Sequence, residues 1–206
     1  KRRIVDILSR TTLRSEVVVT PNRGRDVAPF LIEGSRFLQG HEYILHLHTK
    51  KSPHEKCYTE WGDYLLKNLI GSRPIARSIL KLIATKKIGL VYAKHFHEVQ
   101  ELRNWGFDFE KAQYICNRLG VDISVDQILE FPTSTMFWAR TDAIRPLFGL
   151  GLRYEDFDPE EGQVDGTLAH AIERCLLYVC ENSGFDHLMV TASRDSDADQ
   201  IMRIER

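Results

Sequence analysis

Short strand-like runs alternate with segments of helical periodicity along this sequence, and that alternation constrains the fold more than any other feature. The strand-like runs lie at 14–20, 43–50, 88–92 and 134–140, and apolar residues recur at helical spacing in 27–38, 60–70, 74–85, 109–119 and 166–180. Alternating strands and helices are typical of α/β sandwiches with a parallel sheet. The sequence therefore predicts an α/β fold, a three-layer sandwich around a mainly parallel sheet.

Length and composition fit one globular domain. The chain has 206 residues, of which 43% are hydrophobic and 28% are charged, as in proteins with a buried core. We expect residues 1–194 to form a single domain and residues 195–206 to be a C-terminal tail or the start of the next element. The sequence begins at Lys1 in a segment of helical spacing, without a methionine, so we expect a fragment of a longer chain.

Charge and hydropathy argue against two classes of partner. The net charge of -1 gives no basic field for a nucleic-acid backbone, so no nucleic-acid partner is expected. The sequence has no apolar run of the ~20 residues that cross a bilayer and no signal-peptide core at its start. These features predict a cytoplasmic protein.

Ligands of open α/β sheets bind beyond the carboxyl ends of strands, so polar clusters that follow predicted strands supply the candidate site residues. The first cluster follows the run 14–20 and contains Asn22, Arg23, Arg25 and Asp26 around a glycine. Arginine offers a planar fork of donors that suits phosphate, and Asp26 can fix a guanidinium or hold a sugar hydroxyl. The alternative is a helix cap at Asp26 with surface ion pairs.

The second cluster ends the run 43–50. Alternate side chains of a strand share a face, so we expect His46, His48 and Lys50 to project together. Two imidazoles and an ammonium suit an anionic ligand, and the histidine pair also suits a transition metal. The alternative is a hydrogen-bonded pair of strand histidines beside a solvated lysine.

The third cluster lies at the start of the predicted helix 166–180. Asp165 stands at the expected helix N-terminus, and His170, Glu173 and Arg174 follow within about two turns. His170 and Arg174 are four positions apart and share a helix face. Asp165 is either a helix cap or a functional carboxylate.

Four stretches that include these clusters resemble the rhamnan synthesis protein F family of bacterial rhamnose-polysaccharide assembly. They are NRGRDVAPFL at 22–31, YILHLHTKKS at 43–52, FPTSTMFWAR at 131–140 and VDGTLAHAIER at 164–174. The resemblance implies a glycosyltransferase of the Rossmann-like GT-A layout, with the first strand of that layout lacking before Lys1. Such enzymes carry a metal on a DxD motif. Here a His-x-His-x-Lys segment takes that place, so the need for a divalent metal stays open.

The resemblance also implies a reaction. The donor would be a nucleotide sugar, dTDP-L-rhamnose, and the acceptor a lipid-linked glycan of a growing cell-surface polysaccharide such as rhamnan or O-antigen. An α-linked product would require inversion at the anomeric carbon, and Asp165 is the candidate base. The candidate donor and diphosphate contacts are Asn22, Arg23, Arg25, Asp26, His46, His48 and Lys50. The candidate supporting residues are Trp138, His170, Glu173 and Arg174.

Trp138 and the overall function each have two interpretations. Trp138 is either an apolar platform for a sugar face or a core residue. The rival function is a non-catalytic carbohydrate- or nucleotide-binding module of a multidomain polysaccharide synthase, because a fold does not fix a function. In either case the resemblance implies work at the inner face of the plasma membrane, reached through other parts of the full-length protein.

Overall fold

A computed structural model describes residues 2–12, 14–49, 57–85, 87–160, 162, 165–192 and 201–204. The α-helices are α1 (Arg2–Leu8), α2 (Val27–Ile32), α3 (Cys57–Ile70), α4 (Arg73–Ile83), α5 (Phe109–Arg118), α6 (Thr141–Phe148) and α7 (Leu168–Asn182). The 3-10 helices are η1 (Gly34–Phe37), η2 (His97–Leu102) and η3 (Tyr154–Asp156). The strands are β1 (Tyr43–His46), β2 (Ile88–Ala93), β3 (Phe137–Arg140), β4 (Asp186–Ala192) and β5 (Ile201–Ile204).

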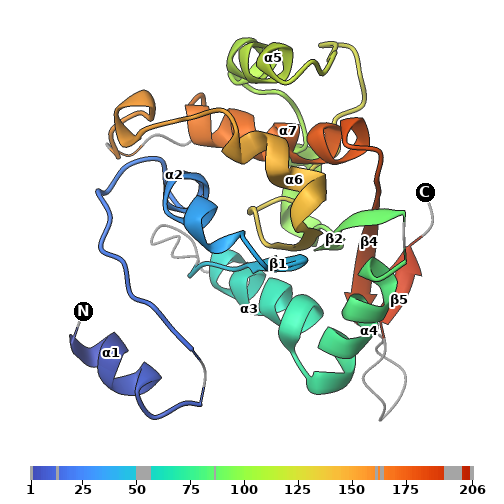
Figure 1. Ribbon diagram of the computed structural model, residues 1–206. Helices are drawn as coiled ribbons and strands as arrows, with labels where there is room; N and C mark the ends of the chain where they lie inside the picture. The colour runs from blue at the N-terminus through green and yellow to red at the C-terminus, as the bar shows by residue number, and fades with distance from the viewer. Residues whose placement is uncertain are drawn as a thin grey trace.

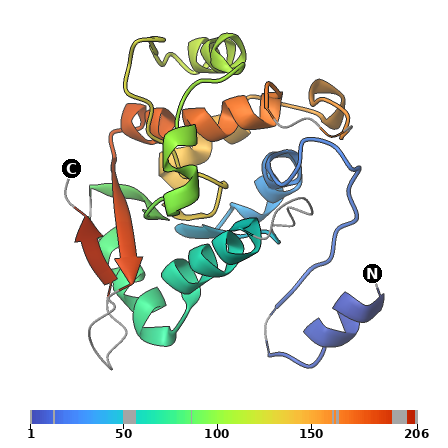
Figure 2. The ribbon, with the colours of Figure 1, turned by 180° about the vertical axis from the view of Figure 1, so that it is seen from behind.

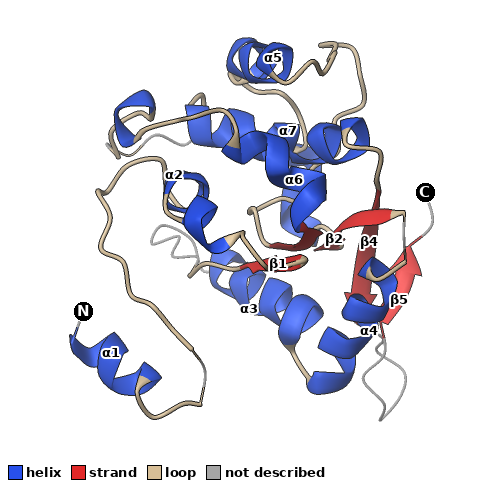
Figure 3. Cartoon of the chain, in the orientation of Figure 1, coloured by secondary structure: helices blue, strands red, loops and turns tan. Residues whose placement is uncertain are grey.

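Helices cover both faces of one sheet, which confirms the α/β class (Figure 1). The side chains of β2 alternate between two cores: Leu90 and Tyr92 pack with α2, α6 and α7, while Val91 and Ala93 pack with α3 and α4. All of β2 is buried. A strand buried on both faces has a nearly continuous apolar sequence, as IGLVYA does. On one face α5 packs on the outer side of α7 (Figure 3).

The sheet is mixed, so the prediction of a mainly parallel sheet is wrong. Its strand order is β1-β3-β2-β4-β5, and only the β2–β4 pair is parallel among the described strands. β3 runs antiparallel to both β1 and β2, and β5 runs antiparallel to β4. The cause lies in the connection between β2 and β3. The helix of this connection, α5, packs on α7 and does not carry the chain back to the opposite edge of the sheet. β3 therefore starts at the edge where β2 ends and runs antiparallel to it.

One predicted strand segment is not a strand, and another begins later than predicted. Residues 14–20 form an unpaired extended run that joins α1 to the body of the molecule (Figure 2). No described strand pairs with this run, and its Val19 is exposed. β3 begins at Phe137 instead of Ser134, because Ser134 and Thr135 have positive φ angles of 92° and 55°, which no strand accommodates. The elements α6, β4 and β5 were not predicted.

The carboxyl ends of β1, β2 and β4 meet at one edge of the sheet, together with the amino end of β3. α7 runs back along the sheet before β4, so its N-terminus reaches the same edge. The segments that hold most of the candidate residues therefore gather at one edge. The proposed boundary between residues 194 and 195 stays a prediction, since residues 193–200 lie outside the described part of the chain. None of the described helices is both long and apolar enough to cross a membrane.

Candidate functional site

Asp26, His46 and His48 form a cluster at the carboxyl end of β1. The Nε2 atoms of His46 and His48 lie 4.0 and 3.9 Å from Oδ2 of Asp26. The centroids of the two imidazole rings are 6.2 Å apart, and each ring also contacts a carbonyl oxygen in the chain before β3. His46 Nδ1 lies 2.6 Å from the carbonyl oxygen of Thr135, and His48 Nε2 lies 2.5 Å from that of Ser134. Residues from three separate segments thus meet around one carboxylate.

The turn formed by Ser134 and Thr135 holds this cluster together. The hydroxyl of Thr135 donates a hydrogen bond to Oδ2 of Asp26, and the backbone N–H of Ser134 donates one to Oε1 of Glu173, 2.6 Å away. Both turn residues have positive φ, as does Arg25, the residue before Asp26. Positive φ in residues other than glycine costs about 1–3 kcal/mol each and is concentrated at functional sites. The surrounding contacts therefore impose a strained backbone at this cluster.

The charge state of this cluster follows from its burial. Burial lowers the pKa of His46, although the nearby Asp26 carboxylate and the hydrogen bond to Thr135 act in the opposite direction. His46 is therefore neutral at pH 7. A neutral imidazole can orient a ligand by hydrogen bonding but gives no net charge for a diphosphate.

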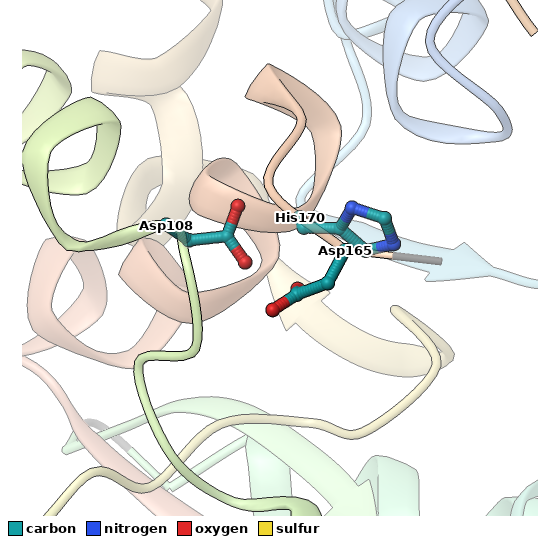
Figure 4. Close-up of side chains that lie close together, drawn as sticks. All are labelled: Asp108, Asp165 and His170. Atoms are coloured by element: carbon teal, nitrogen blue, oxygen red, sulfur yellow. The ribbon is translucent and has the colours of Figure 1, made fainter. Parts of the chain in front are cut away.

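A second cluster lies before α7 and unites two carboxyl groups with one guanidinium. Figure 4 shows the carboxyl groups of Asp108 and Asp165 turned toward each other, with His170 beside Asp165. Arg174 binds both, with Nη1 2.7 Å from Oδ2 of Asp108 and Nη2 3.1 Å from Oδ1 of Asp165. Oδ2 of Asp165 also accepts a hydrogen bond from the backbone N–H of Phe107, 3.2 Å away. Both oxygens of Asp165 are thus engaged.

The two carboxyl groups differ in their ionisation. Burial, with the hydrogen bond to Asp165, raises the pKa of Asp108 to about 8, against the opposing charges of Arg174 and Lys111. Burial alone would also raise the pKa of Asp165, but the hydrogen bonds from Asp108 and Phe107 and the charge of Arg174 outweigh it and lower that pKa. Asp108 therefore keeps its proton at pH 7, and Asp165 carries the negative charge. This is the shared-proton arrangement of two adjacent carboxyl groups.

Asp108, Asp165 and His170 each place one possible ligand atom within 4.8 Å of the others, and carboxylate and imidazole donors suit a divalent metal. The remaining contacts do not fit such an ion. Arg174 already binds both carboxyl groups through a buried guanidinium. A divalent cation would have to displace this guanidinium. We therefore interpret this cluster as a carboxyl pair neutralised by arginine.

The raised pKa of Asp108 gives a testable pH dependence. Its folded-state pKa of about 8 lies above the ordinary value of 3.8, so between these values the folded state binds more protons than the unfolded state. We therefore expect this group to make the free energy of unfolding fall as the pH rises from about 4 to about 8. Asp108→Asn keeps a donor toward Asp165 and removes the titration. Urea denaturation at pH 5, 6, 7 and 8 should show a flatter dependence in this variant than in the wild type.

Asp142→Asn is the matched control, because the Asp142 side chain is 71% exposed on the surface of α6. It should leave the pH dependence unchanged. Equal slopes for the wild type and Asp108→Asn would mean that Asp108 is already ionised in the folded protein.

Helix α7 connects the two clusters. Glu173 binds the Ser134 turn, and its neighbour Arg174 binds Asp108 and Asp165. The N-cap of α7 is Thr167, whose hydroxyl accepts a hydrogen bond from the backbone N–H of His170. Asp165 lies two positions before this cap, so its interpretation as the helix cap is wrong. The reason is local, since Gly166 with φ 79° separates Asp165 from the first turn.

The structure places the other predicted residues less closely together. Asn22 is exposed, Arg23 forms an isolated β-bridge with Pro159, and the backbone N–H of Arg25 binds Glu160. Lys50 lies outside the described residues.

Trp138 lies on the other face of the sheet. Its indole Nε1 donates to the carbonyl oxygen of Leu69 in α3, and its ring packs with the α3–α4 core. It is therefore separated from both clusters by the sheet.

Three residues of the two clusters were missed from the sequence. Asp108 occupies the N-cap position of α5 but makes no capping hydrogen bond, so its sequence context is that of an ordinary cap. Ser134 and Thr135 lie in a run that resembles a strand. The sequence signal that favours them is their place within FPTSTMFWAR, one of the four stretches of family resemblance.

A pocket opens beside the first cluster. It is lined by His46, Thr135 and apolar side chains of α2, β3, α6 and α7, and its empty volume is about 230 Å³ with open solvent included. Apart from His46 and Thr135 its lining is apolar, so it is a small crevice at the edge of the core and not by itself a site for a polar ligand.

Comparison with known proteins gives one family and two relatives. The sequence model of the family described as rhamnan synthesis protein F matches residues 1–185. Two curated proteins from different strains of Xanthomonas campestris pv. campestris, both named uncharacterized protein WxcX, are 34% identical to this chain over 182 residues. The match covers 88% of this chain but only 26% of each relative, so the chain spans about a quarter of their length. No solved structure gives a significant match.

Proposed function

The chain belongs to the rhamnan synthesis protein F family, and from this we propose that it is a sugar-transfer domain for bacterial polysaccharide assembly. The proposed reaction moves rhamnose from dTDP-L-rhamnose to a lipid-linked glycan, with inversion at the anomeric carbon. The proposed place of work is the inner face of the plasma membrane, reached through other parts of the full-length protein. A GT-A layout is part of this proposal.

One observation carries the proposal. The Asp26 carboxylate joins His46, His48 and the turn at Thr135, so three of the four family-like stretches meet at one point. The fourth stretch joins them through Glu173 on α7, which binds the Ser134 turn. Strained backbone at the same place supports a functional purpose for the cluster, because folding alone does not favour it.

In the proposed mechanism the acceptor hydroxyl attacks the anomeric carbon as the bond from that carbon to the diphosphate breaks. The hydroxyl proton passes to the carboxylate of Asp165, and dTDP leaves with the bonding electron pair. Arg25 and Lys50 are the proposed cations for the departing diphosphate, and His46 orients the donor as a neutral hydrogen-bonding group. Positive groups aimed at developing negative charge are usually the largest contribution to catalysis.

A second function, a non-catalytic binding module, is favoured by the surroundings of Asp165. Both of its oxygens are engaged, and its lowered pKa makes it a weak base. Hydrolysis of dTDP-L-rhamnose and transfer to a glycan by the full-length protein separate the two functions. Neither reaction is expected of a binding module, whereas a transferase should show at least slow hydrolysis of its donor.

We expect Arg25→Ala to weaken donor binding more than folding. Arg25 is exposed beside Asp26, and cations that meet a diphosphate contribute charge-assisted hydrogen bonds of about 1.5–3 kcal/mol. Titration calorimetry of the full-length protein with dTDP should show a loss of affinity of about tenfold or more. Lys50→Ala is expected to act in the same direction.

The matched control for these two variants is Arg77→Ala, which removes an exposed cation from α4 on the opposite face of the sheet. It should change neither the affinity for dTDP nor the melting temperature. If Arg25→Ala lowered the melting temperature and left the affinity intact, Arg25 would be a structural residue.

A further inference from the structure

Phe107 is an exposed aromatic residue directly beside the carboxyl pair. Its side chain is 85% exposed, while its backbone N–H donates to Oδ2 of Asp165. Single exposed apolar residues are common and need no functional explanation. Phe107 differs from such residues because its neighbours on both sides in the loop are held by burial, hydrogen bonds or an ion pair.

The residues before Phe107 are held in place by packing and by hydrogen bonds. Trp105 is buried and stacks on Tyr178, with ring centroids 6.1 Å apart. The carbonyl oxygen of Asn104 accepts from Nε of Arg174, and its side-chain oxygen accepts from the N–H of Gly106. The loop is thus anchored before Phe107.

Asp108 anchors the loop on the other side of Phe107. It is fully buried, and its carboxyl group binds Arg174. Between the two anchors, Gly106 has φ 52°, and a Cβ atom there would lie 2.0 Å from Oδ2 of Asp165. The chain therefore passes so close to the carboxylate that any side chain at this position would displace it. The result is a rigid loop that presents one aromatic ring to solvent next to a charged oxygen.

An aromatic face beside a carboxylate matches the chemistry of a sugar. A pyranose ring has a face of C–H groups that packs on an aromatic ring, and hydroxyls at its rim that donate to carboxylate oxygens. A 6-deoxyhexose adds a methyl group to its apolar surface. The carboxylate of Asp165 accepts from the backbone N–H of Phe107, so it lies next to the residue that carries the ring. Each carboxylate oxygen has a second lone pair, which can accept from a sugar hydroxyl.

We propose that Phe107 is the platform for the terminal sugar of the acceptor glycan. The inference rests on the proposed transfer reaction and names the acceptor side of the same site: a saccharide whose apolar face stacks on Phe107 and whose reacting hydroxyl meets Asp165. The cluster of Asp26, His46 and His48 then serves the donor. Both clusters contact the N-terminal half of α7, the first through Glu173 and the carboxyl pair through Arg174.

The test uses the full-length protein with Phe107→Ala and Phe107→Trp. The alanine variant should raise the KM for a short α-linked rhamnose oligosaccharide about tenfold, which corresponds to about 1.4 kcal/mol of lost stacking. Its kcat and its affinity for dTDP should stay near wild type, and tryptophan should preserve most of the acceptor binding. Tyr114→Ala is the control, since Tyr114 is a 61% exposed aromatic residue on α5 with no contact to the carboxyl pair among the described interactions.

Direct binding separates this inference from the proposed function. Saturation-transfer NMR with the same oligosaccharide needs no turnover, and it should show the saccharide signal in the wild type and a strong loss in Phe107→Ala. Equal signals in both proteins would refute the platform even if transfer occurs. Binding that depends on Phe107 in a protein without transfer would overturn the transferase and retain the saccharide site. A lowered melting temperature with unchanged saccharide binding would assign Phe107 to a contact with another part of the polypeptide.

Discussion

Replacing Asp165 with asparagine should lower rhamnosyl transfer by the full-length protein at least ~100-fold, while affinity for dTDP stays near wild type. The substitution removes the proposed proton acceptor and nearly preserves the size of the side chain. General-base catalysis typically contributes about 10²- to 10⁴-fold, which sets the expected range. Donor affinity should be spared because Arg25, a proposed diphosphate contact, adjoins Asp26 of the other cluster.

The contacts of Asp165 also set the stability cost of this substitution. Because the helix cap is Thr167, asparagine at 165 does not act as a substitute cap. The side-chain NH2 group of asparagine must instead face Arg174 or the backbone N–H of Phe107. Both of these are hydrogen-bond donors, so one hydrogen bond is lost. Loss of one charge-assisted hydrogen bond costs about 1.5–3 kcal/mol, more than the exchange of one cap for another.

Transfer and folding therefore have to be measured on the same preparation. A transfer assay with a lipid-linked or synthetic glycan, run well below the melting temperature of the variant, isolates the chemical effect. Transfer at close to the wild-type rate would show that Asp165 only anchors the loop at Phe107. The base would then be sought among Asp26, His170 and Glu173.

Arg174→Met should destabilise the protein by about 3 kcal/mol, the largest stability effect that we expect of a single side chain here. Arg174 is only 8% exposed and is the cation that both carboxyl groups contact. Methionine retains much of the buried volume but leaves Asp165 charged without its partner. Removal of one partner from a buried pair typically costs about 3–5 kcal/mol, and the partial exposure of Asp165 places this case at the low end.

The loss should depend on pH in a defined direction. Without the guanidinium, the pKa of both carboxyl groups should rise in the folded state. The folded state would then bind more protons than the unfolded state, so the free energy of unfolding would fall as the pH increases. Urea denaturation should therefore show a larger loss at pH 8 than at pH 5. Adding Asp108→Asn to Arg174→Met should reduce that difference.

Arg145→Met is the control for this measurement. It breaks the Arg145–Asp142 pair, in which both side chains are more than half exposed, and surface pairs contribute about 0–1 kcal/mol. A comparably small loss for Arg174→Met would mean that water reaches the carboxyl pair and screens it.

Much of the secondary structure was predictable because it depends on local periodicity. The helices α3, α4, α5 and α7 lie close to the predicted segments, and β2 follows its apolar run. The family was also recognisable from the four stretches of resemblance, and the match over residues 1–185 confirms it. Strand direction was not predictable, since a helical segment between two strands does not reveal whether it crosses the sheet. α5 instead packs on α7, and β3 consequently runs against its neighbours.

The candidate site was predictable only as residue types near strand ends. His46 and His48 were expected to point to one side, and the structure places both beside Asp26. Trp138 was ambiguous, because side chains on a strand alternate between faces and its register was unknown. Asp108 could not be distinguished from a helix cap until its carboxyl group was placed against Arg174.

The sequence by itself determined the class of fold, the family and the set of polar segments from which a site can be built, because these depend on periodicity and on short motifs. Only the tertiary structure decided which charges meet. Ionisation depends on burial and on partners within a few ångströms, and these partners come from segments far apart in the chain. Asp108 and Asp165 are 57 positions apart, yet their shared environment gives one a pKa of about 8 and holds the other ionised.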